Sequence, residues 1–412
     1  MDKTLYIYLD DVSCPQPMLV GQLSAQNLRG KEVFAFEFSD LWLKQRTGRP
    51  LDPDLQLYAG RQFLQTEKSN FGIFLDSSPD RWGRVLLDRR EAIRAKDTNR
   101  QLQTLQESDY LLGVYDECRM GALRIKSSPD GGFLDDDPDF STPPLASLGE
   151  LEHASWRLEQ DTDADTRQWL RIILAPGSSL GGARPKANIK ATDGHLWIAK
   201  FPSRHDKHDI GAWETVAMTL ARRCGIRVAP FESRRLNGTH HTFLTRRFDR
   251  DEHNKRIHFS SAMTMLGYTD SETTGCSYLE LAEWISRYCC DVEENLAEMW
   301  RRIVFNIAVS NCDDHLRNHG FLLTAGGWTL SPAYDLNPQA DGAGLSLNIN
   351  EKDNSLDYRL AKEVAPYFGL SATDADMIID HTTEVVSSWR TVAARCHIPL
   401  DGQELMANAF IH

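Results

Sequence analysis

The chain has 412 residues and no long hydrophobic run. Its longest apolar stretches, such as 172–175 and 303–309, fall far short of the ~18–20 residues that cross a bilayer. The first three residues run directly into an apolar stretch at 5–9, without the charged region and apolar core of a secretory signal. These absences predict a protein with neither a membrane span nor a signal peptide.

Paired cysteine motifs and excess positive charge are also lacking. The eight cysteines contain no C-x-x-C pair, which favours reduced thiols and a cytoplasmic location. The formal net charge is −13, so bulk charge does not suit a nucleic-acid backbone. Any role on nucleic acid would need a local patch or a basic partner. The ordinary globular composition and the length predict two or three folded domains.

Local patterns divide the chain into four parts. Residues 1–128 combine short alternating runs, such as 33–38, with a helical stretch at 81–96 and a closing strand at 121–126, and they predict a small α+β unit. The acidic segment 129–146, rich in Pro and Gly, is predicted to be a linker. Residues 147–252 are predicted to be rich in strands, and 253–412 to be mostly helical.

In the third part, residues 147–252, turn residues and a helix cap predict the order of the strands and helices. A small-residue loop at 176–183 is expected to join two extended segments. A hairpin is predicted around Asp193-Gly194, between 187–191 and 195–201, and a second one at Asn237-Gly238, between 226–236 and 239–247. Between them lies a predicted helix that Asp209 caps and that ends at 225. In the helical part the clearest helices are 278–289 and 292–309, with a short hairpin from 320 to 330.

The small-residue loop permits two interpretations. Residues 177–181 match G-x-S-x-G, the nucleophile elbow of α/β-hydrolases, but that elbow requires a helix directly after the serine. Here a strand follows, which disfavours a hydrolase. Small residues also allow backbone N–H groups to approach phosphate oxygens closely. The loop lacks a G-x-x-x-x-G-K-[ST] pattern and therefore does not indicate a Walker-type NTPase.

The order of the residues after the loop favours a kinase. Lys200 lies on the following strand, where a kinase carries its phosphate-pairing lysine, and Glu214, on the next helix, is placed to pair with that lysine. Taken separately, Lys200 is more typical of a surface lysine and Glu214 of a solvated helix residue. Asp313 precedes Asn318 by five residues, the spacing of a kinase base and its metal-binding Asn, whereas Asp314 does not have this spacing.

Asp335 completes a predicted magnesium site. It follows a short hairpin seventeen residues after Asn318, and carboxylate and amide oxygens are the hard ligands that magnesium prefers. The simpler alternatives are a zinc site or polar turn around Asp313, and a turn-capping role for Asp335. Without a second His or Cys at ligand spacing, zinc is disfavoured.

Two other polar clusters are poor metal-site candidates. Residues 161–165 begin like an EF-hand, but Thr166 stands where Gly is required and Ile172 where Glu is required. His205 and His208 flank acidic residues and are more typical of an exposed polar loop.

The assembled motifs resemble the HipA family, the serine/threonine-kinase toxins of bacterial toxin–antitoxin pairs. The resemblance covers nearly the whole chain. It implies an α+β fold with a kinase-like bilobal core, a β-rich N-lobe and a helical C-lobe, preceded by a small α+β N-terminal subdomain. The strings that carry it are 178–186, 247–250, 311–318 and 334–335, with 36–38, 78–81 and 121–124 near the N-terminus.

The resemblance also assigns roles to residues. Asp313 would be the catalytic base, and Asn318 and Asp335 would hold Mg²⁺. A serine in the loop is autophosphorylated in the family, and Ser179 matches it, with Ser178 as the adjacent candidate. A phosphate there would repel the phosphates of ATP. The implied ATP-binding residues are Ser179, Leu180, Gly181, Gly182, Ala183, Lys200, Glu214, Arg246 and Phe248.

The family's partners lead to a functional hypothesis and two alternatives. Its known substrates are aminoacyl-tRNA synthetases, and a helix-turn-helix antitoxin restrains its toxins and makes the DNA contacts. The resemblance allows a homodimer within that complex. The first hypothesis is an ATP- and Mg²⁺-dependent serine/threonine protein kinase toxin. The alternatives are an antitoxin-bound pseudokinase that acts as co-repressor, and a small-molecule kinase.

Overall fold

The computed structural model describes residues 2–45, 50–64, 68–134, 142–160, 169–170, 172–174, 182, 184–269 and 275–410. It divides into two compact units. Unit 1 comprises Met1–Arg204 with Asp249–Ser260, and unit 2 comprises His205–Phe248 with Ser261–His412. Each unit is described by itself. The four-part division expected from the sequence remains a prediction.

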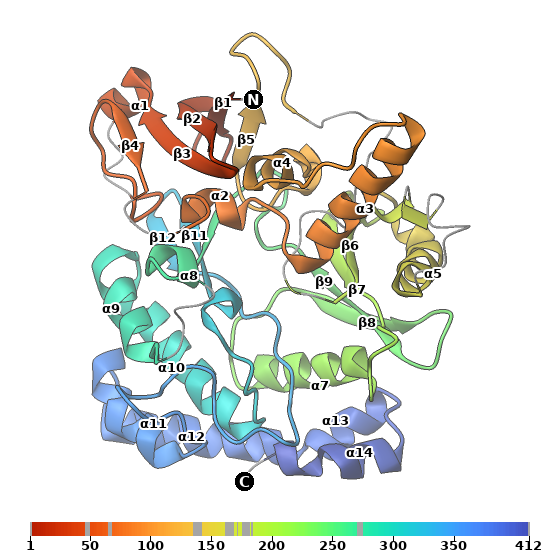
Figure 1. The fold of residues 1–412 in the computed structure, drawn as a ribbon. Coiled ribbons are helices and arrows are strands. Elements are labelled where there is room, and N and C mark those ends of the chain that lie inside the picture. The colour runs from red at the N-terminus through yellow and green to blue at the C-terminus, as the bar shows by residue number, and fades with distance from the viewer. Residues whose placement is uncertain are drawn as a thin grey trace. The chain divides into compact units, whose positions relative to one another are not determined.

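Unit 1 contains an antiparallel five-stranded sheet (Figure 1). Its strand order is β4-β3-β2-β1-β5, and each neighbouring pair is antiparallel. Phe36 is buried on its inner face, where its ring lies 5.7 Å from that of Phe74. The predicted N-terminal strands are therefore confirmed. Their bounds are β1 (Lys3–Leu9), β2 (Met18–Leu28), β3 (Lys31–Phe38), β4 (Arg61–Phe63) and β5 (Leu123–Lys126).

Short helices accompany this sheet in unit 1. The predicted helix at 81–96 is α3 (Arg81–Asp97), and the side chain of Asp80 caps it by accepting a hydrogen bond from Gly83 N. Strands β6 (Lys186–Lys190) and β7 (Leu196–Lys200) form the hairpin predicted at Asp193-Gly194. The other helices are α1 (Asp40–Gln45), α2 (Gly72–Asp76), α4 (Glu107–Leu112), η1 (Asp116–Cys118), η3 (Leu145–Ser147) and α5 (Leu148–Glu159).

One expectation about the small-residue loop is wrong. Residues 169–170 and 172–174, just before it, are helical, so an extended segment lies only on its far side. The run is apolar at most positions, and an apolar run of this length does not distinguish a buried strand from a buried helix. Leu170 and Ile173 are both buried.

Unit 2 begins with α7 (Ile210–Arg223) and the hairpin β8 (Phe231–Arg235) and β9 (His241–Arg246). Asp209 caps α7 as predicted, by accepting a hydrogen bond from Ala212 N, and its other oxygen contacts His241 Nδ1 at 2.6 Å. Helix and strand approach so closely that a Cβ on Gly211 would lie 2.1 Å from the His241 carbonyl oxygen. Residues 226–230, which were expected to extend the first strand, lie outside it.

The rest of unit 2 is mostly helical (Figure 1). Helix α10 is buried along most of its length, and its Trp300 donates a hydrogen bond to the Ala361 carbonyl. Trp389 stacks on Phe410 at 4.3 Å beside α7. Strand β10 (His258–Ser261) belongs to unit 1 except for its last residue. The bounds in unit 2 are α8 (Ala262–Met265), α9 (Tyr278–Tyr288), α10 (Val292–Ala308), η4 (Leu316–Asn318), β11 (Gly320–Thr324), β12 (Gly327–Leu330), α11 (Tyr358–Val364), η5 (Ala365–Phe368), α12 (Ala372–Ser387), α13 (Trp389–Arg395), α14 (Leu400–Met406) and η6 (Ala407–Ala409).

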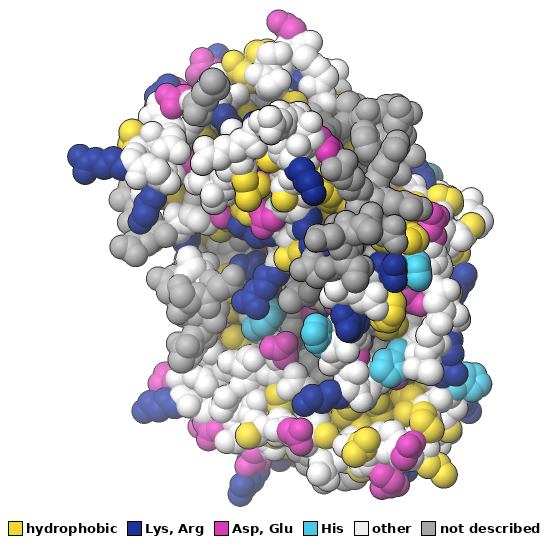
Figure 2. Space-filling model, turned by 45° about the vertical axis from the view of Figure 1, so that its right-hand side comes forward, with side chains coloured by type: hydrophobic (Ala, Val, Ile, Leu, Met, Phe, Trp, Pro, Cys, Tyr) yellow, Lys and Arg dark blue, Asp and Glu magenta, His cyan; other side chains and the backbone are white. Residues whose placement is uncertain are grey.

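Two features bear on contact with membranes and nucleic acids: the hydropathy of the described helices and the charge on the face drawn in Figure 2. Among the described residues, no helix is long and apolar enough to cross a membrane. On the face drawn in Figure 2, acidic and basic side chains are interspersed. The negative net charge is therefore not gathered into one patch on that face.

Candidate functional site

The loop between α10 and β11 in unit 2 carries the predicted catalytic residues. It starts at Ser310, whose φ of 48° turns the chain sharply out of the helix. The side chain of Asn318 then donates a hydrogen bond back to the carbonyl of Asp313 at 2.9 Å. The two residues that the five-residue spacing paired are thus brought together within one closed loop.

Asp314 is fully engaged in the interior of unit 2. Its Oδ2 atom accepts hydrogen bonds from the Tyr278 hydroxyl at 2.5 Å and from Asn306 Nδ2 at 2.8 Å, and it lies 2.8 Å from His319 Nε2. Burial alone would raise the pKa of this carboxyl, but His319 and the hydrogen bonds lower it below its usual value. A carboxylate held in this way anchors the loop and is poorly placed to accept a substrate proton.

Asp313, its neighbour, is exposed. Partial burial raises the pKa of its carboxyl, Asp335 and Asp314 raise it further by repulsion, and His315 opposes the rise. A carboxylate that is accessible and somewhat more basic than usual is suited to accept a proton from an incoming hydroxyl. The two adjacent aspartates therefore have different chemistry, and only Asp313 has that of a base.

The oxygen atoms around Asp335 are compatible with a magnesium ion. Asp335 has a φ of 59°, a left-handed conformation that is uncommon for a residue with a side chain. Two residues further on, Asn337 has a buried Oδ1 that accepts no hydrogen bond within the described part of the chain. Because Asn318 donates through its nitrogen, its oxygen remains for a cation. Hard oxygens with few carboxylates match a magnesium ion that also binds phosphate.

No larger metal cluster is present in the described ranges. They contain no group of three or more His, Cys, Asp and Glu side chains that could hold a metal ion. His205 and His208 are both exposed, in agreement with a polar loop. The EF-hand-like residues 161–165 lie outside the described residues.

A buried chain of amides connects Asp335 with Asp314. Asn337 Nδ2 donates to Asp335 at 3.3 Å, and the Asn337 backbone N–H donates to Asn311 Oδ1 at 3.1 Å. Asn311 Nδ2 donates to Asn306 Oδ1 at 3.0 Å, and Asn306 in turn donates to Asp314. These amides were not among the predicted site residues. Asn311 stands within the string 311–318, but only the packing shows that its side chain bridges two segments.

In unit 1, two lysines face each other across the β6–β7 hairpin. Lys186 and Lys200 are directly opposite in the register, and Lys186 is buried. Like charges opposite each other destabilise a strand pair unless an anion lies between them. The Lys186 ammonium is 3.7 Å from Asp80, and a Cβ on Gly182 would come within 2.8 Å of it. Lys186 was not predicted as a site residue, although it ends the string 178–186.

The other expected ATP-binding residues are only partly described. Gly182 has a φ of +88° and accepts a hydrogen bond from Trp82 N, but Ser178, Ser179, Leu180, Gly181 and Ala183 lie outside the described residues. In unit 2, Glu214 is buried on α7, and Arg246 ends β9. The Phe248 ring lies 5.4 Å from that of Tyr334, next to Asp335.

The string 247–250 has a structural role that the sequence did not reveal. Asp249 is fully buried, and its Oδ2 accepts the Gly121 backbone N–H at 2.7 Å. Arg250 donates to Asp249 at 2.7 Å and to the carbonyls of Arg119 and Glu117. The strings 121–124 and 247–250 both carry the family resemblance. Within unit 1 they are joined by the hydrogen bond from Gly121 to Asp249, although these two residues lie 128 positions apart in the chain.

Comparisons with known proteins bear on the family and the fold of the chain. The family model described as "HipA-like C-terminal domain" matches residues 178–389, just over half of the chain. The solved complex of HipA, HipB and operator DNA from Shewanella oneidensis MR-1 contains a chain with the same fold. The match has a TM-score of 0.67 and 19% identity, over 98% of this chain and 94% of that one. The fold is thus that of a kinase-like α+β protein.

Two curated relatives are named as kinases. The serine/threonine-protein kinase toxin HipA of Shewanella oneidensis is 24% identical over 365 residues, which are 81% of this chain and 74% of the relative. Y4mE of Sinorhizobium fredii is 26% identical over 243 residues, 51% of this chain and 56% of its own length. The chain thus spans little more than half of Y4mE. With the family model, these matches show that the chain belongs to the HipA family, as its motifs indicate.

Proposed function

We propose that the chain is an ATP- and Mg²⁺-dependent serine/threonine protein kinase and the toxin of a toxin–antitoxin pair. The observation that carries this proposal is the contrast between Asp313 and Asp314. The backbone carbonyl of the exposed Asp313 accepts a hydrogen bond from Asn318, and repulsion from Asp335 raises the pKa of its carboxyl, while the Asp314 carboxylate is buried beside His319. A protein that served only as a scaffold would not require an exposed carboxylate with a raised pKa directly beside a buried, hydrogen-bonded one.

In the proposed reaction Asp313 takes the proton of an acceptor hydroxyl. The hydroxyl oxygen forms a bond to the γ-phosphorus of ATP, and the bond from that phosphorus to the β,γ-bridging oxygen breaks, so ADP leaves with the electron pair. Lys186 and Lys200 would neutralise the phosphate oxygens. Bound magnesium would offset the charge that develops on the phosphates, and Asn318 and Asp335 would hold it. Asn337 would orient Asp335.

Regulation and partners follow from the family. We propose that Ser179, or the adjacent Ser178, is autophosphorylated and that the added charge excludes ATP. The protein substrate would be an aminoacyl-tRNA synthetase, and a HipB-like helix-turn-helix antitoxin would bind both the toxin and DNA. A cytoplasmic location agrees with the described cysteines, none of which forms a disulfide.

Mass spectrometry of the intact protein and its peptides tests the proposal. Purified protein is incubated with ATP and magnesium, beside the Asp313→Asn variant. We expect an adduct of about 80 Da, one phosphoryl group, on Ser178 or Ser179 of the wild type alone. ATP binding without any adduct, and without transfer to a protein, would instead favour an antitoxin-bound co-repressor.

A further inference from the structure

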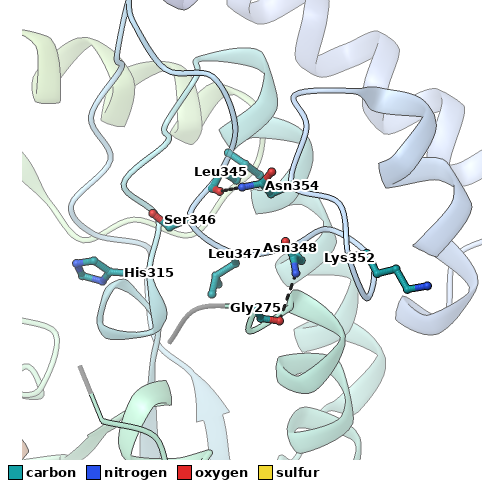
Figure 3. Close-up of a pocket in the computed structure, with 8 residues that line it drawn as sticks. All are labelled: Gly275, His315, Leu345, Ser346, Leu347, Asn348, Lys352 and Asn354. Carbon is teal, nitrogen blue, oxygen red and sulfur yellow. Dashed lines mark hydrogen bonds between the residues drawn. The ribbon is translucent and has the colours of Figure 1, made fainter. Parts of the chain in front are cut away.

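A pocket of about 650 Å³ lies beside the catalytic loop in unit 2. Its lining runs from His315, on the loop, through Ser346, Leu347 and Asn348 to Lys352 (Figure 3). In this view His315 and Lys352 stand at opposite ends of the lining, and Leu347, Asn348 and Gly275 lie between them. Apart from His315, which stands within the string 311–318, none of these residues was singled out by the sequence.

The wall of the pocket is a fixed loop at residues 345–354. Leu345 N donates to the Asn354 carbonyl at 2.8 Å, Ile349 N donates to the Asp353 carbonyl at 2.7 Å, and Asn354 Nδ2 donates back to the Leu345 carbonyl at 2.6 Å. These bonds close the loop on itself. Such a wall is built before any ligand arrives.

Both sides of this wall are attached to the rest of unit 2. On one side Ser346 Oγ donates to the carbonyl of Cys312 at 2.7 Å, and Cys312 directly precedes Asp313. On the other side the backbone of Asn348 pairs with Cys276 and Tyr278 at the start of α9. The wall is therefore held in register with the proposed base, so a molecule in the pocket would lie next to the reacting hydroxyl.

The pocket offers the chemistry of a polypeptide site. Its lining supplies two asparagine side chains, a serine hydroxyl, the His315 imidazole and two leucines, and Lys352 is the one lysine or arginine among the described lining residues. The backbone N–H groups of Ser346 and Leu347 make no hydrogen bond within the described part of the chain. A polyanionic small molecule would require several cations, whereas an extended chain uses backbone donors and small polar side chains.

We propose that this pocket binds the acceptor protein, as an extended segment along residues 345–348 with an acidic residue toward Lys352. This inference rests on the proposed kinase function and specifies where that kinase holds its substrate. Lys352 is exposed, and no ion-pair partner for it is found among the described residues. A cation at the rim of a pocket selects for a nearby negative charge more than it adds affinity.

Steady-state kinetics with two generic acceptors tests the site. The probes are dephosphorylated casein, which is acidic, and myelin basic protein. Ser346→Trp fills the pocket from an exposed position, and we expect its KM for casein to rise about tenfold or more, equivalent to ~1.4 kcal/mol. Its KM for ATP should stay within about twofold. Leu400→Trp places the same side chain at an exposed position on α14 and should change neither value.

Charge reversal at the rim is the second arm of the test. Lys352→Glu should lower kcat/KM for casein about fivefold and leave that for myelin basic protein unchanged or higher. Arg395→Glu, an exposed reversal outside the pocket, is the matched control. Wild-type acceptor kinetics in both Ser346→Trp and Lys352→Glu would overturn the inference. Faster turnover of sugars or lipids than of either protein would also overturn it. Wild-type protein that transfers phosphate to no acceptor, itself included, would overturn the proposed function instead.

Discussion

His319 Nε2 lies 2.8 Å from Asp314 Oδ2, and both side chains are buried. The pair holds the two ends of the loop between α10 and β11 together, because Asp314 is near its start and His319 directly precedes β11. The hydroxyl of Tyr278 reaches the same oxygen from α9. Asp314 therefore joins three segments of unit 2 and leaves Asp313 to face the solvent.

Replacing Asp314 should damage stability more than replacing Asp313. Asp314→Asn removes a buried charge that three donors share, and we expect a loss of about 1–3 kcal/mol in the free energy of unfolding. Asp313→Asn changes an exposed side chain and should stay within about 0.5 kcal/mol of wild type. Urea unfolding of both variants measures the difference. Equal stabilities would show that the buried network does not anchor the loop.

Replacing Asp313 should instead abolish the chemistry. Asp313→Asn keeps the size of the side chain but cannot accept a proton, so turnover should fall by ~10²–10⁴. Phosphate transfer to casein and autophosphorylation measure turnover, and calorimetric ATP binding serves as the control because it should be retained. A variant that keeps the full rate would eliminate Asp313 as the base.

Asp335 is expected to control toxicity through the metal. Asp335→Asn removes the carboxylate of the proposed magnesium site, so transfer should fall and should require more magnesium. Expression of the wild type should arrest growth, and expression of Asp335→Asn should not. The comparison requires equal protein levels by immunoblot. Equal growth of the two strains would contradict the proposal.

The facing lysines should both contribute to ATP affinity. Lys186→Ala and Lys200→Ala each remove a positive charge next to the expected phosphate position, and we expect each to weaken ATP binding by about 1.5–3 kcal/mol. Lys190, on the same β6 strand, is exposed and pairs with Glu117, so Lys190→Ala is the matched control. Calorimetry measures all three. Unchanged affinity in both facing-lysine variants would remove the hairpin from the ATP site.

His258 should make unit 1 sensitive to acid. Burial lowers the pKa of this side chain to about 4 from a usual 6.5. In the unfolded chain it takes up a proton as the pH falls below 6.5, but in the folded chain it does so only near 4. The contribution of His258 to the free energy of unfolding is therefore complete above pH 6.5, and it declines by about 3 kcal/mol as the pH falls from 6.5 to 4. His258→Asn should flatten this part of the profile of unfolding free energy against pH. A variant profile parallel to that of the wild type would contradict the assignment.

The local parts of the fold could be predicted because neighbouring residues determine them. Asp193-Gly194 and Asn237-Gly238 form the turns of two of the three predicted hairpins, and Asp209 caps its helix. The apolar run before residue 176 was predicted to be extended, but its described residues are helical. The prediction was wrong because burial favours the same apolar residues in strands and in helices.

The site could be predicted only in part. Asp313, Asn318 and Asp335 follow a spacing that a single loop and hairpin preserve. Lys186, Asn311 and Asn337 were missed, because their partners are fixed by strand register and by packing between segments. The wall of the pocket was missed for the same reason.

By itself, the sequence determined the family, the order of the elements and the five-residue spacing between the proposed base, Asp313, and the proposed metal-binding amide, Asn318. These properties depend on residues that are close in the chain. Tertiary structure alone decided that Asp314 is buried and Asp313 exposed, and that Asp249 holds Gly121 across 128 positions. Burial and long-range hydrogen bonds arise only when distant segments pack, and no local pattern encodes them.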